Sequence, residues 1–179
     1  YQDIRIIVLN SNHKLPEQLD YLERQLKNCT AKWKIVTCHH SIFSPVAKRD
    51  FKYGREHLRP LLEKYGVDLV LNGHDHSYAR GHVCHIDADT GVEGDLGAVY
   101  VTSVSGPKQY AADPKDMERY DKDGYQPDKR TNLVQFFQVI TVENNTLNFI
   151  AYDVLGQVRD QFTITKDFKT NTRTWLRNK

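Results

Sequence analysis

The chain has only three cysteines, one methionine and a net charge of +2 in 179 residues. Cys29, Cys38 and Cys84 have no metal-type spacing and cannot all pair with one another, so they leave the redox compartment open. The near balance of 25 basic and 23 acidic side chains gives no field strong enough to indicate nucleic-acid binding. No apolar stretch reaches the length of a membrane span. We therefore expect neither a nucleic-acid partner nor a membrane partner.

The sequence also lacks a signal-like opening and a methionine at its first position. It begins instead with the apolar, β-branched run "IRIIVL" at residues 4–9, which predicts a strand almost at once. The overall composition, with 39% hydrophobic and 27% charged residues, is typical of a globular domain. We expect residues 1–179 to form a single domain that is the C-terminal portion of a longer one.

The first 72 residues alternate apolar runs with helical patterns. Strands are predicted over 4–9, 34–38 and 67–71, and helices over 16–29 and 55–66, with Pro60 expected to kink the second helix or delay its start. Strand, helix, strand, helix, strand in these lengths indicates a largely parallel sheet. This part of the chain is predicted to have an α/β fold.

The pattern changes after residue 80 to an α+β character. Strands are predicted over 98–104, 136–142, 146–154 and 158–166, with "ENN" and "LGQ" as turns, and together they suggest an antiparallel meander. The polar stretch 105–133 is predicted to be a long surface loop. The basic segment 166–179, "KDFKTNTRTWLRNK", is predicted to be a solvated end.

Histidines follow the predicted parallel strands at their carboxyl ends. The strand ends read "NSNH", "HHSIFS" and "NGHDH", and ligands of open α/β sheets collect at this edge. His39, His40, His74 and His76 should therefore converge, with His74 and His76 on one side of an extended backbone and Asp75 on the other. Grouped neutral imidazoles are ligands for zinc, iron or manganese. The alternative is that these histidines are packing residues of a purely structural, β-rich domain.

Two of these stretches resemble known signature motifs. "WKIVTCHHS" and "VDLVLNGHDHSYAR" are similar to the V-x-x-H and G-H-x-H blocks of the calcineurin-like metallophosphoesterases, and most similar to their purple acid phosphatase branch. The resemblance implies the C-terminal half of a four-layer αββα sandwich. It also implies hydrolysis of phosphate monoesters or diesters by metal-activated water at a centre of two transition metal ions, Fe, Zn or Mn. Export to the periplasm or the extracellular space is implied by the resemblance alone.

The resemblance assigns roles to single histidines. His39 and His74 would bind one metal ion and His76 the other. His40 and His57 are candidate catalytic residues. His40, adjacent to a ligand, would either support that ligand or contact the substrate phosphate. His57 would contact the substrate, but "REHLR" does not match the family's pattern, and a solvated position on its helix is the alternative. Phosphate oxygens could be bound by basic residues on and after the loop that follows His40, namely Lys48, Arg49, Lys52 and Arg55. The alternative is a basic loop that is only solvated.

Three further blocks of that family are missing from this sequence. It has no G-D near its start, no G-D-x-x-Y and no G-N-H, which supply the carboxylates and the asparagine of the family's centre. Three histidines can hold one zinc-like ion with an open position, but not two ions. We therefore expect at most one ion in this chain alone, no activity without the N-terminal part of the same protein, and full activity only in the parent. A non-catalytic module that binds metal or phosphate is the alternative.

A second possible metal cluster lies in "RGHVCHIDADTG". Alternation along a strand would put Cys84 with His82 on one face and His85 on the other, which disfavours a shared ion. The "DADTG" segment is predicted to be a hairpin turn.

Overall fold

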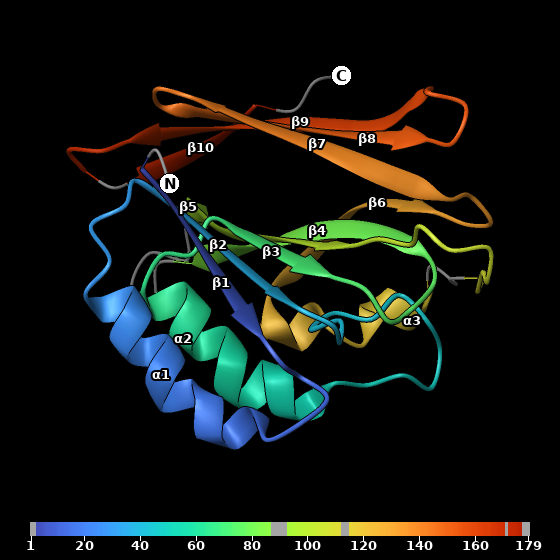
Figure 1. The fold of residues 1–179 in the computed structure, drawn as a ribbon, viewed down its shortest axis with the longest axis horizontal. Helices are drawn as coiled ribbons and strands as arrows, with labels where there is room; N and C mark the ends of the chain where they lie inside the picture. Colours follow the sequence, from blue (N-terminus) through green and yellow to red (C-terminus); the bar gives the residue numbers. More distant parts are fainter. Residues whose placement is uncertain (1–2, 87–92, 112–114, 171, 177–179) are drawn as a thin grey trace.

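The computed structural model describes residues 3–86, 93–111, 115–170 and 172–176. Three layers are stacked in it: helices, a six-stranded sheet and a four-stranded sheet (Figure 1). Helices α1 (Leu15–Lys27), α2 (Arg59–Lys64) and the short α3 (Lys115–Glu118) lie on one face of the six-stranded sheet. The four-stranded sheet packs on its other face. The predicted α/β class, with antiparallel structure in the second half, is confirmed.

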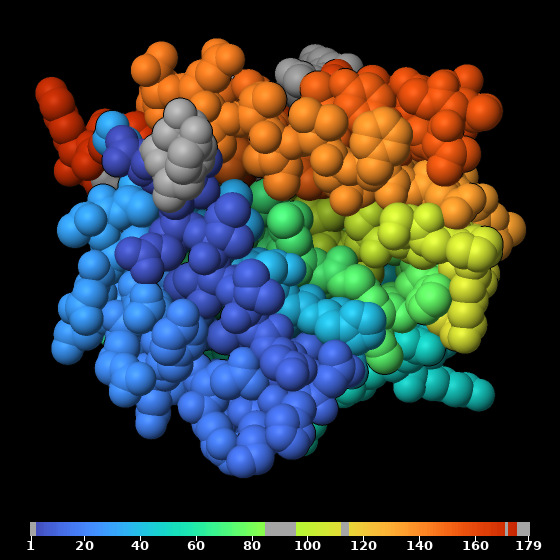
Figure 2. All heavy atoms as spheres, in the orientation of Figure 1, coloured from blue at the N-terminus to red at the C-terminus, as the bar shows by residue number. Residues whose placement is uncertain are grey.

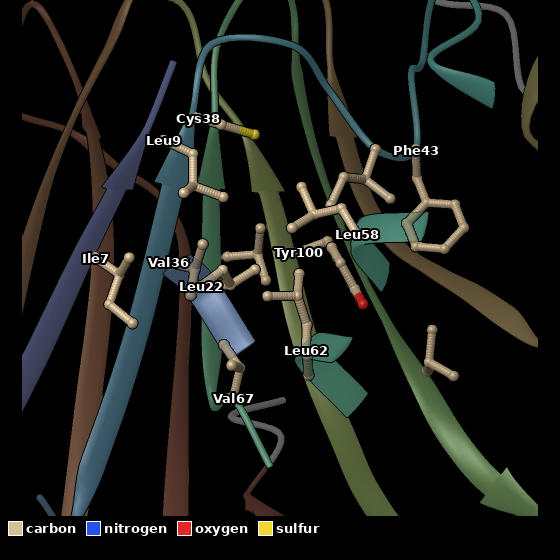
Figure 3. Packing of buried hydrophobic residues seen from close by; sticks show 14 of the residues in the cluster. Ile7, Leu9, Leu22, Val36, Cys38, Phe43, Leu58, Leu62, Val67 and Tyr100 are labelled. Carbon is tan, nitrogen blue, oxygen red and sulfur yellow. The ribbon is translucent and has the colours of Figure 1, made fainter. Parts of the chain in front are cut away.

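The parallel half forms as its hydrophobic pattern predicts. Strands β1 (Ile4–Leu9), β2 (Trp33–Cys38) and β3 (Leu69–Asn72) pair in parallel in the order β1-β2-β3. Leucines of α1 and α2 pack against this sheet in one buried cluster, part of which Figure 3 shows. Because the three strands run in the same direction, their carboxyl ends and the loops that follow share one edge.

The second helix begins earlier than its pattern predicts, and its helical backbone runs without a break over residues 52–64. A π-helical segment at Gly54–Leu58 lies within this run and leads directly into α2, whose second residue is Pro60. Proline inside a helix removes one backbone hydrogen bond and disturbs the turn before it. The irregularity expected at Pro60 is therefore present as a π-helical segment, whereas the expected delay of the helix start is wrong.

The six-stranded sheet contains two strands that the sequence pattern does not reveal, β4 (Tyr78–Ile86) and β6 (Tyr125–Thr131). β4 pairs antiparallel with β6 on one side and with β5 (Glu93–Thr102) on the other, and β5 pairs in parallel with β3. The expectation that strand 98–104 belongs to the meander is wrong, because β5 pairs with β3 and β4 inside the six-stranded sheet. The predicted "DADTG" turn, which includes residues 87–91, lies outside the described residues.

The predicted long loop at 105–133 is wrong in its second half. That stretch contains α3, a 3-10 turn at Asp121–Asp123 and strand β6. β6 lies at the end of the strand order and keeps most of its polar side chains at least partly exposed, while Tyr125 is buried at its start. It has no alternating apolar pattern; it pairs with β4, and its Asp128 contacts Arg80 and His82 of that strand.

The second sheet is an antiparallel meander. Its strands are β7 (Phe136–Glu143), β8 (Thr146–Asp153), β9 (Val158–Asp167) and β10 (Thr172–Leu176), in the order β10-β9-β8-β7. Both predicted hairpins, at "ENN" and "LGQ", are confirmed. The prediction of a solvated end over 166–179 is wrong for β10, which pairs with β9.

Buried charges join this sheet to the first one. Asp68, fully buried just before β3, lies 3.0 Å from the Lys166 ammonium and 3.5 Å from the Arg173 guanidinium. Its carboxylate also accepts a hydrogen bond from the Lys34 amide at 2.8 Å. These contacts explain why two basic residues of the C-terminal segment are buried, since each buried cation needs an anionic partner.

Candidate metal centre

The loops after β2, β3 and β5 leave the sheet at the same end (Figure 1), and their atoms adjoin one another at the surface (Figure 2). The Gly73 amide donates to the His39 carbonyl at 3.0 Å, which fixes the loop after β3 against the loop after β2. The Ser11 hydroxyl, after β1, accepts a hydrogen bond from the His40 amide at 2.9 Å. The three strand ends therefore lie together, and the predicted convergence holds for His39, His40 and His74 but not for His76.

Three imidazoles lie against one another at this edge. The ring centroids of His39, His40 and His74 are 4.4 to 5.3 Å apart. The closest approach is between Nε2 of His39 and Nδ1 of His74, at 3.0 Å. Two ligands of one tetrahedral zinc ion, each about 2.0–2.1 Å from the metal, lie roughly 3.3 Å apart. The two nitrogens therefore have nearly the separation that a shared ion requires.

His76 is directed away from this pair. Its Nδ1 is 3.0 Å from the Lys108 carbonyl, and its ring packs edge-on against Tyr110 with the centroids 5.2 Å apart. The expectation of an extended backbone here is wrong, because His74 and His76 have φ angles of 69° and 49°. Left-handed backbone turns successive side chains differently from a strand. Asp75 is nevertheless buried while both histidines remain partly exposed, as expected.

The histidine set fits part of a metal centre. His39 and His74 supply two converging nitrogens, while structural zinc sites use four ligands and catalytic ones use three. Among the described residues, no group of three or more His, Cys, Asp or Glu side chains is placed to hold a metal ion. His76 would have to rotate away from Lys108, or other ligands would have to come from elsewhere, to complete the coordination.

Burial keeps two of these imidazoles neutral. It lowers the pKa of His40, and the neighbouring His39 lowers it further. Burial likewise lowers the pKa of His74, with His40 and Arg49 adding to the effect. The neutral imidazole is the form that binds metal ions, so the site favours the binding state at neutral pH.

The two candidate catalytic histidines lie in different places. His40 is part of the imidazole group, with its Nδ1 3.0 Å from the Ser11 hydroxyl. His57 lies on the π-helical segment, exposed, stacked on Tyr53 at 4.2 Å, with its Nδ1 3.2 Å from the Tyr53 carbonyl. The structure thus brings His40 to the imidazole group, whereas His57 occupies the solvated position that the sequence left open.

Sequence reasoning missed the residues that surround His76. Arg49 was only one of four basic candidates, and neither Asp75 nor Tyr110 was assigned a role. The Arg49 guanidinium donates to the His74 carbonyl at 3.1 Å and lies 3.6 Å from the Asp75 carboxylate. The cation–aromatic pair of Arg49 and Tyr110, at 4.8 Å, joins loops 61 residues apart, which no local pattern could reveal.

The residues after the G-H-x-H block anchor it to the second sheet. Tyr78 and Arg80, on β4, both donate to the carboxylate of Asp160 on β9, at 2.7 Å from the Tyr78 hydroxyl and 2.7 and 3.0 Å from the Arg80 guanidinium. All three side chains are buried. The strand that follows the loop with His74 and His76 is therefore attached to the second sheet by a hydrogen-bonded ion pair.

The second possible cluster is held by protein contacts. His82 Nδ1 lies 2.7 Å from the Asp128 carboxylate on β6, and His82 is buried. The finding that no metal-type group occurs in the described part of the chain includes His82 and Cys84. In the same part of the chain, no helix is long and apolar enough to cross a membrane.

The sequence is similar to those of known phosphoesterases. Residues 3–78 match the family model "Calcineurin-like phosphoesterase". Purple acid phosphatase 17 of Arabidopsis thaliana is 31% identical over 152 residues, which is 81% of this chain and 39% of the relative. Purple acid phosphatase 3 of the same plant is 31% identical over 157 residues, 84% of this chain and 37% of the relative. The chain thus spans well under half the length of these curated relatives.

Solved structures with a similar fold include a plant enzyme and a parasite protein. Purple acid phosphatase PPD1 from yellow lupin seeds has a TM-score of 0.69 and 22% identity, covering 94% of this chain and 32% of that one. GAP50, described as the anchor in the inner membrane complex of Plasmodium, has a TM-score of 0.60 and 21% identity, covering 88% of this chain and 48% of that one. At these identities the likeness concerns the fold.

Proposed function

We propose that this chain, which belongs to the calcineurin-like phosphoesterases and to their purple acid phosphatase-like branch, is part of an enzyme that hydrolyses phosphate monoesters or diesters at a dinuclear metal centre. The observation that carries the proposal is the 3.0 Å approach of His39 Nε2 and His74 Nδ1 at the carboxyl ends of two adjacent parallel strands. In this assignment His39 and His74 hold one ion and His76 is a ligand of the other.

The ions, when bound, would polarise the phosphoryl group and supply a nucleophile at neutral pH. The residues of this chain prepare the place for them. Burial keeps His40 and His74 neutral and able to bind. The hydrogen bond from the Gly73 amide to the His39 carbonyl, and the one that the Ser11 hydroxyl accepts from the His40 amide, fix the loops that carry the imidazoles. In this proposal His40, whose ring contacts those of His39 and His74, would contact a substrate oxygen.

We propose that the remaining ligands come from a part of the protein that precedes this sequence. Three imidazoles leave the charge of two ions unbalanced, so bridging carboxylates are needed. β1 is the edge strand of its sheet, and its Ile6 and Val8 side chains are 61% and 72% exposed. A groove of about 670 Å³, lined by Val8, Leu71 and His39 among others, extends from this edge to His39. Such an apolar edge beside the site suits a further part of the same domain.

The test compares this chain with the complete protein. The complete protein should contain two metal ions and hydrolyse a chromogenic phosphate ester, whereas this chain should bind at most one zinc ion and show no turnover. Replacement of His74 by Ala should abolish zinc binding by the chain, and His57→Ala should leave the zinc content unchanged. A complete protein that binds two metals and hydrolyses neither monoesters nor diesters would refute the enzymatic assignment.

A non-catalytic module that holds metal or phosphate is the second candidate. It is favoured by the orientation of His76 toward Lys108 and by the incomplete ligand set of the described residues. This module would bind one zinc ion through His39 and His74, and the complete protein would show no turnover. The same two measurements, metal content and hydrolysis, therefore separate the candidates.

Export is a further proposal and rests on the purple acid phosphatase relatives. Fractionation of the source cells, with immunodetection of the protein, tests it. Recovery in the periplasmic or extracellular fraction would support export, and recovery in the cytosol would refute it.

A further inference from the structure

Two cations from separate loops meet beside His76. Arg49 lies on the loop after β2, and Lys108 lies on the loop after β5. The Arg49 guanidinium is 4.8 Å and the Lys108 ammonium 5.3 Å from the centre of the Tyr110 ring. Both distances are within the range of cation–aromatic attraction. Tyr110 therefore brings together two positive charges that would otherwise repel each other.

The Arg49 guanidinium is fixed on three sides. It donates to the His74 carbonyl at 3.1 Å and to the Tyr110 hydroxyl at 3.4 Å. It also lies 3.6 Å from a carboxylate oxygen of Asp75, whose side chain is 1% exposed. Neither carboxylate oxygen of Asp75 has a hydrogen-bond partner, so Arg49 is the nearby positive charge that offsets the cost of burying it.

Arg49 nevertheless keeps a face open to solvent. Its side chain is 31% exposed, and it lines a cavity of about 80 Å³ together with His40, His74 and Ser44. A guanidinium has five N–H donors in a planar fork. Only some of them are used by the His74 carbonyl and the Tyr110 hydroxyl, so further donors can reach an oxyanion at the imidazole group.

The loop that carries Lys108 is tied to the same point. The Tyr110 amide donates to the His76 carbonyl at 3.0 Å, and the Lys108 carbonyl lies 3.0 Å from His76 Nδ1. Lys108 itself is exposed. The Lys108 ammonium therefore lies over the ring of Tyr110, which packs against the candidate metal ligand His76. It remains accessible to solvent.

We propose that Arg49 and Lys108, ordered by Tyr110 and Asp75, form an oxyanion-binding rim that holds the non-bridging oxygens of the phosphate ester. That the ligand is a phosphate ester rests on the proposed function. That Arg49 and Lys108 bind an oxyanion does not depend on it. Arg49 supplies paired donors of fixed geometry, and Lys108 supplies a mobile point charge. Asp75 and Tyr110 are positioning residues, since they act through the guanidinium.

The test measures binding of inorganic phosphate to metal-free protein by equilibrium dialysis. Arg49→Ala should weaken phosphate binding about tenfold or more, as expected for loss of charge-assisted hydrogen bonds, and Lys108→Ala by a smaller factor. Lys64→Ala is the matched control, because it removes one positive charge from a side chain at the end of α2 that is 60% exposed. It should leave the dissociation constant unchanged within a factor of about two, a general-charge effect being small for an exposed cation.

Two further variants separate binding from folding. Arg49→Lys keeps the charge near Tyr110 but loses the fork, so phosphate affinity should lie between those of the wild-type protein and Arg49→Ala. Asp75→Asn should weaken phosphate binding while Arg49 is still present, because the guanidinium loses its buried counter-charge. The melting temperature of each variant shows whether it is folded, and Arg49→Lys decides the matter if Arg49→Ala unfolds.

The proposal is overturned if the wild-type chain binds no phosphate, or if Arg49→Ala, Arg49→Lys and Lys108→Ala all bind it as tightly as Lys64→Ala. Failure of the enzymatic proposal is a different result. In that case the complete, metal-loaded protein would not hydrolyse phosphate esters, while metal-free protein would still bind phosphate through Arg49. If the complete protein is active, Arg49→Ala should raise the inhibition constant of inorganic phosphate, and an unchanged constant would count against the rim.

Discussion

Replacing Asp160 by Ala should destabilise the protein strongly, although Asp160 lies in the second sheet, away from the candidate centre. The Asp160 side chain is 6% exposed and accepts three hydrogen bonds, one from Tyr78 and two from Arg80. Removing it leaves a buried guanidinium with Asp128, 3.1 Å away, as its remaining carboxylate partner among the described contacts. Loss of one partner of a buried ion pair typically costs about 3–5 kcal/mol.

This cost is large compared with the stability of a domain. A free energy of unfolding of about 5–15 kcal/mol is typical, so the variant would lose a substantial share of it. For a chain of this length, each kcal/mol lowers the melting temperature by about 2–4 °C. Asp160→Ala should therefore melt roughly 6–20 °C below the wild-type protein.

Urea unfolding, followed by tryptophan fluorescence and circular dichroism, measures the difference. Glu17→Ala is the matched control, because it also removes one carboxylate, but from an ion pair with Lys14 in which both side chains are more than half exposed. That control should cost less than about 1 kcal/mol. If Asp160→Ala costs no more than Glu17→Ala, the buried ion pair does not join the sheets as argued here.

Three further predictions concern the core, the pH dependence and a thiol. Phe149→Ala removes a fully buried ring and should lower the free energy of unfolding in urea by about 3–5 kcal/mol. Phe137→Ala, at a half-exposed ring, should lower it by only about 0.5 kcal/mol. Equal losses would contradict the assigned layers. Burial raises the pKa of Asp153, but hydrogen bonds from its own turn outweigh this and leave it lowered. The advantage of wild type over Asp153→Asn in melting temperature should thus be full at neutral pH and vanish as the pH falls below about 4, and an advantage that persists at lower pH would be inconsistent with this. Burial raises the pKa of Cys38 to about 11, so at pH 8 only about 1 in 1000 molecules has the thiolate; mass spectrometry should find Cys29 alkylated first, and equal rates would refute the burial.

The sequence predicted the parallel half well because its signals are local. Strands β1, β2 and β3 are short apolar runs, and the leucines of α1 repeat with helical spacing. Once the strands run in parallel, topology alone places the loops after them at one edge. The approach of His39 and His74 therefore followed from the strand ends without any knowledge of side-chain contacts.

The strands that were missed depend on partners far away in the sequence. Lys166 and Arg173 look like surface residues in isolation, but both contact Asp68, which precedes Lys166 by 98 residues. β6 is polar and pairs with β4. No pattern within a window of ten residues distinguishes such segments from a loop.

The direction of His76 was missed for a different reason. An alternating pattern assumes extended backbone, whereas His74 and His76 have positive φ angles that only a turn provides. The contacts of Arg49 with Tyr110 were missed because both residues lie on loops without periodicity. The site was therefore predictable where it depends on strand topology, and unpredictable where it depends on turn geometry.

The segment "GHDHSYAR" connects the candidate centre to the rest of the molecule, one residue at a time. His74 contacts the loop after β2, Asp75 faces Arg49 on that same loop, and His76 contacts the loop after β5. Arg80 then binds Asp160 of the second sheet. One short segment, in which His74 and His76 have left-handed backbone, thus contacts both loops and, through Arg80 on β4, the second sheet. The geometry of the two imidazole nitrogens therefore depends on the packing of both sheets as well as on the histidines themselves.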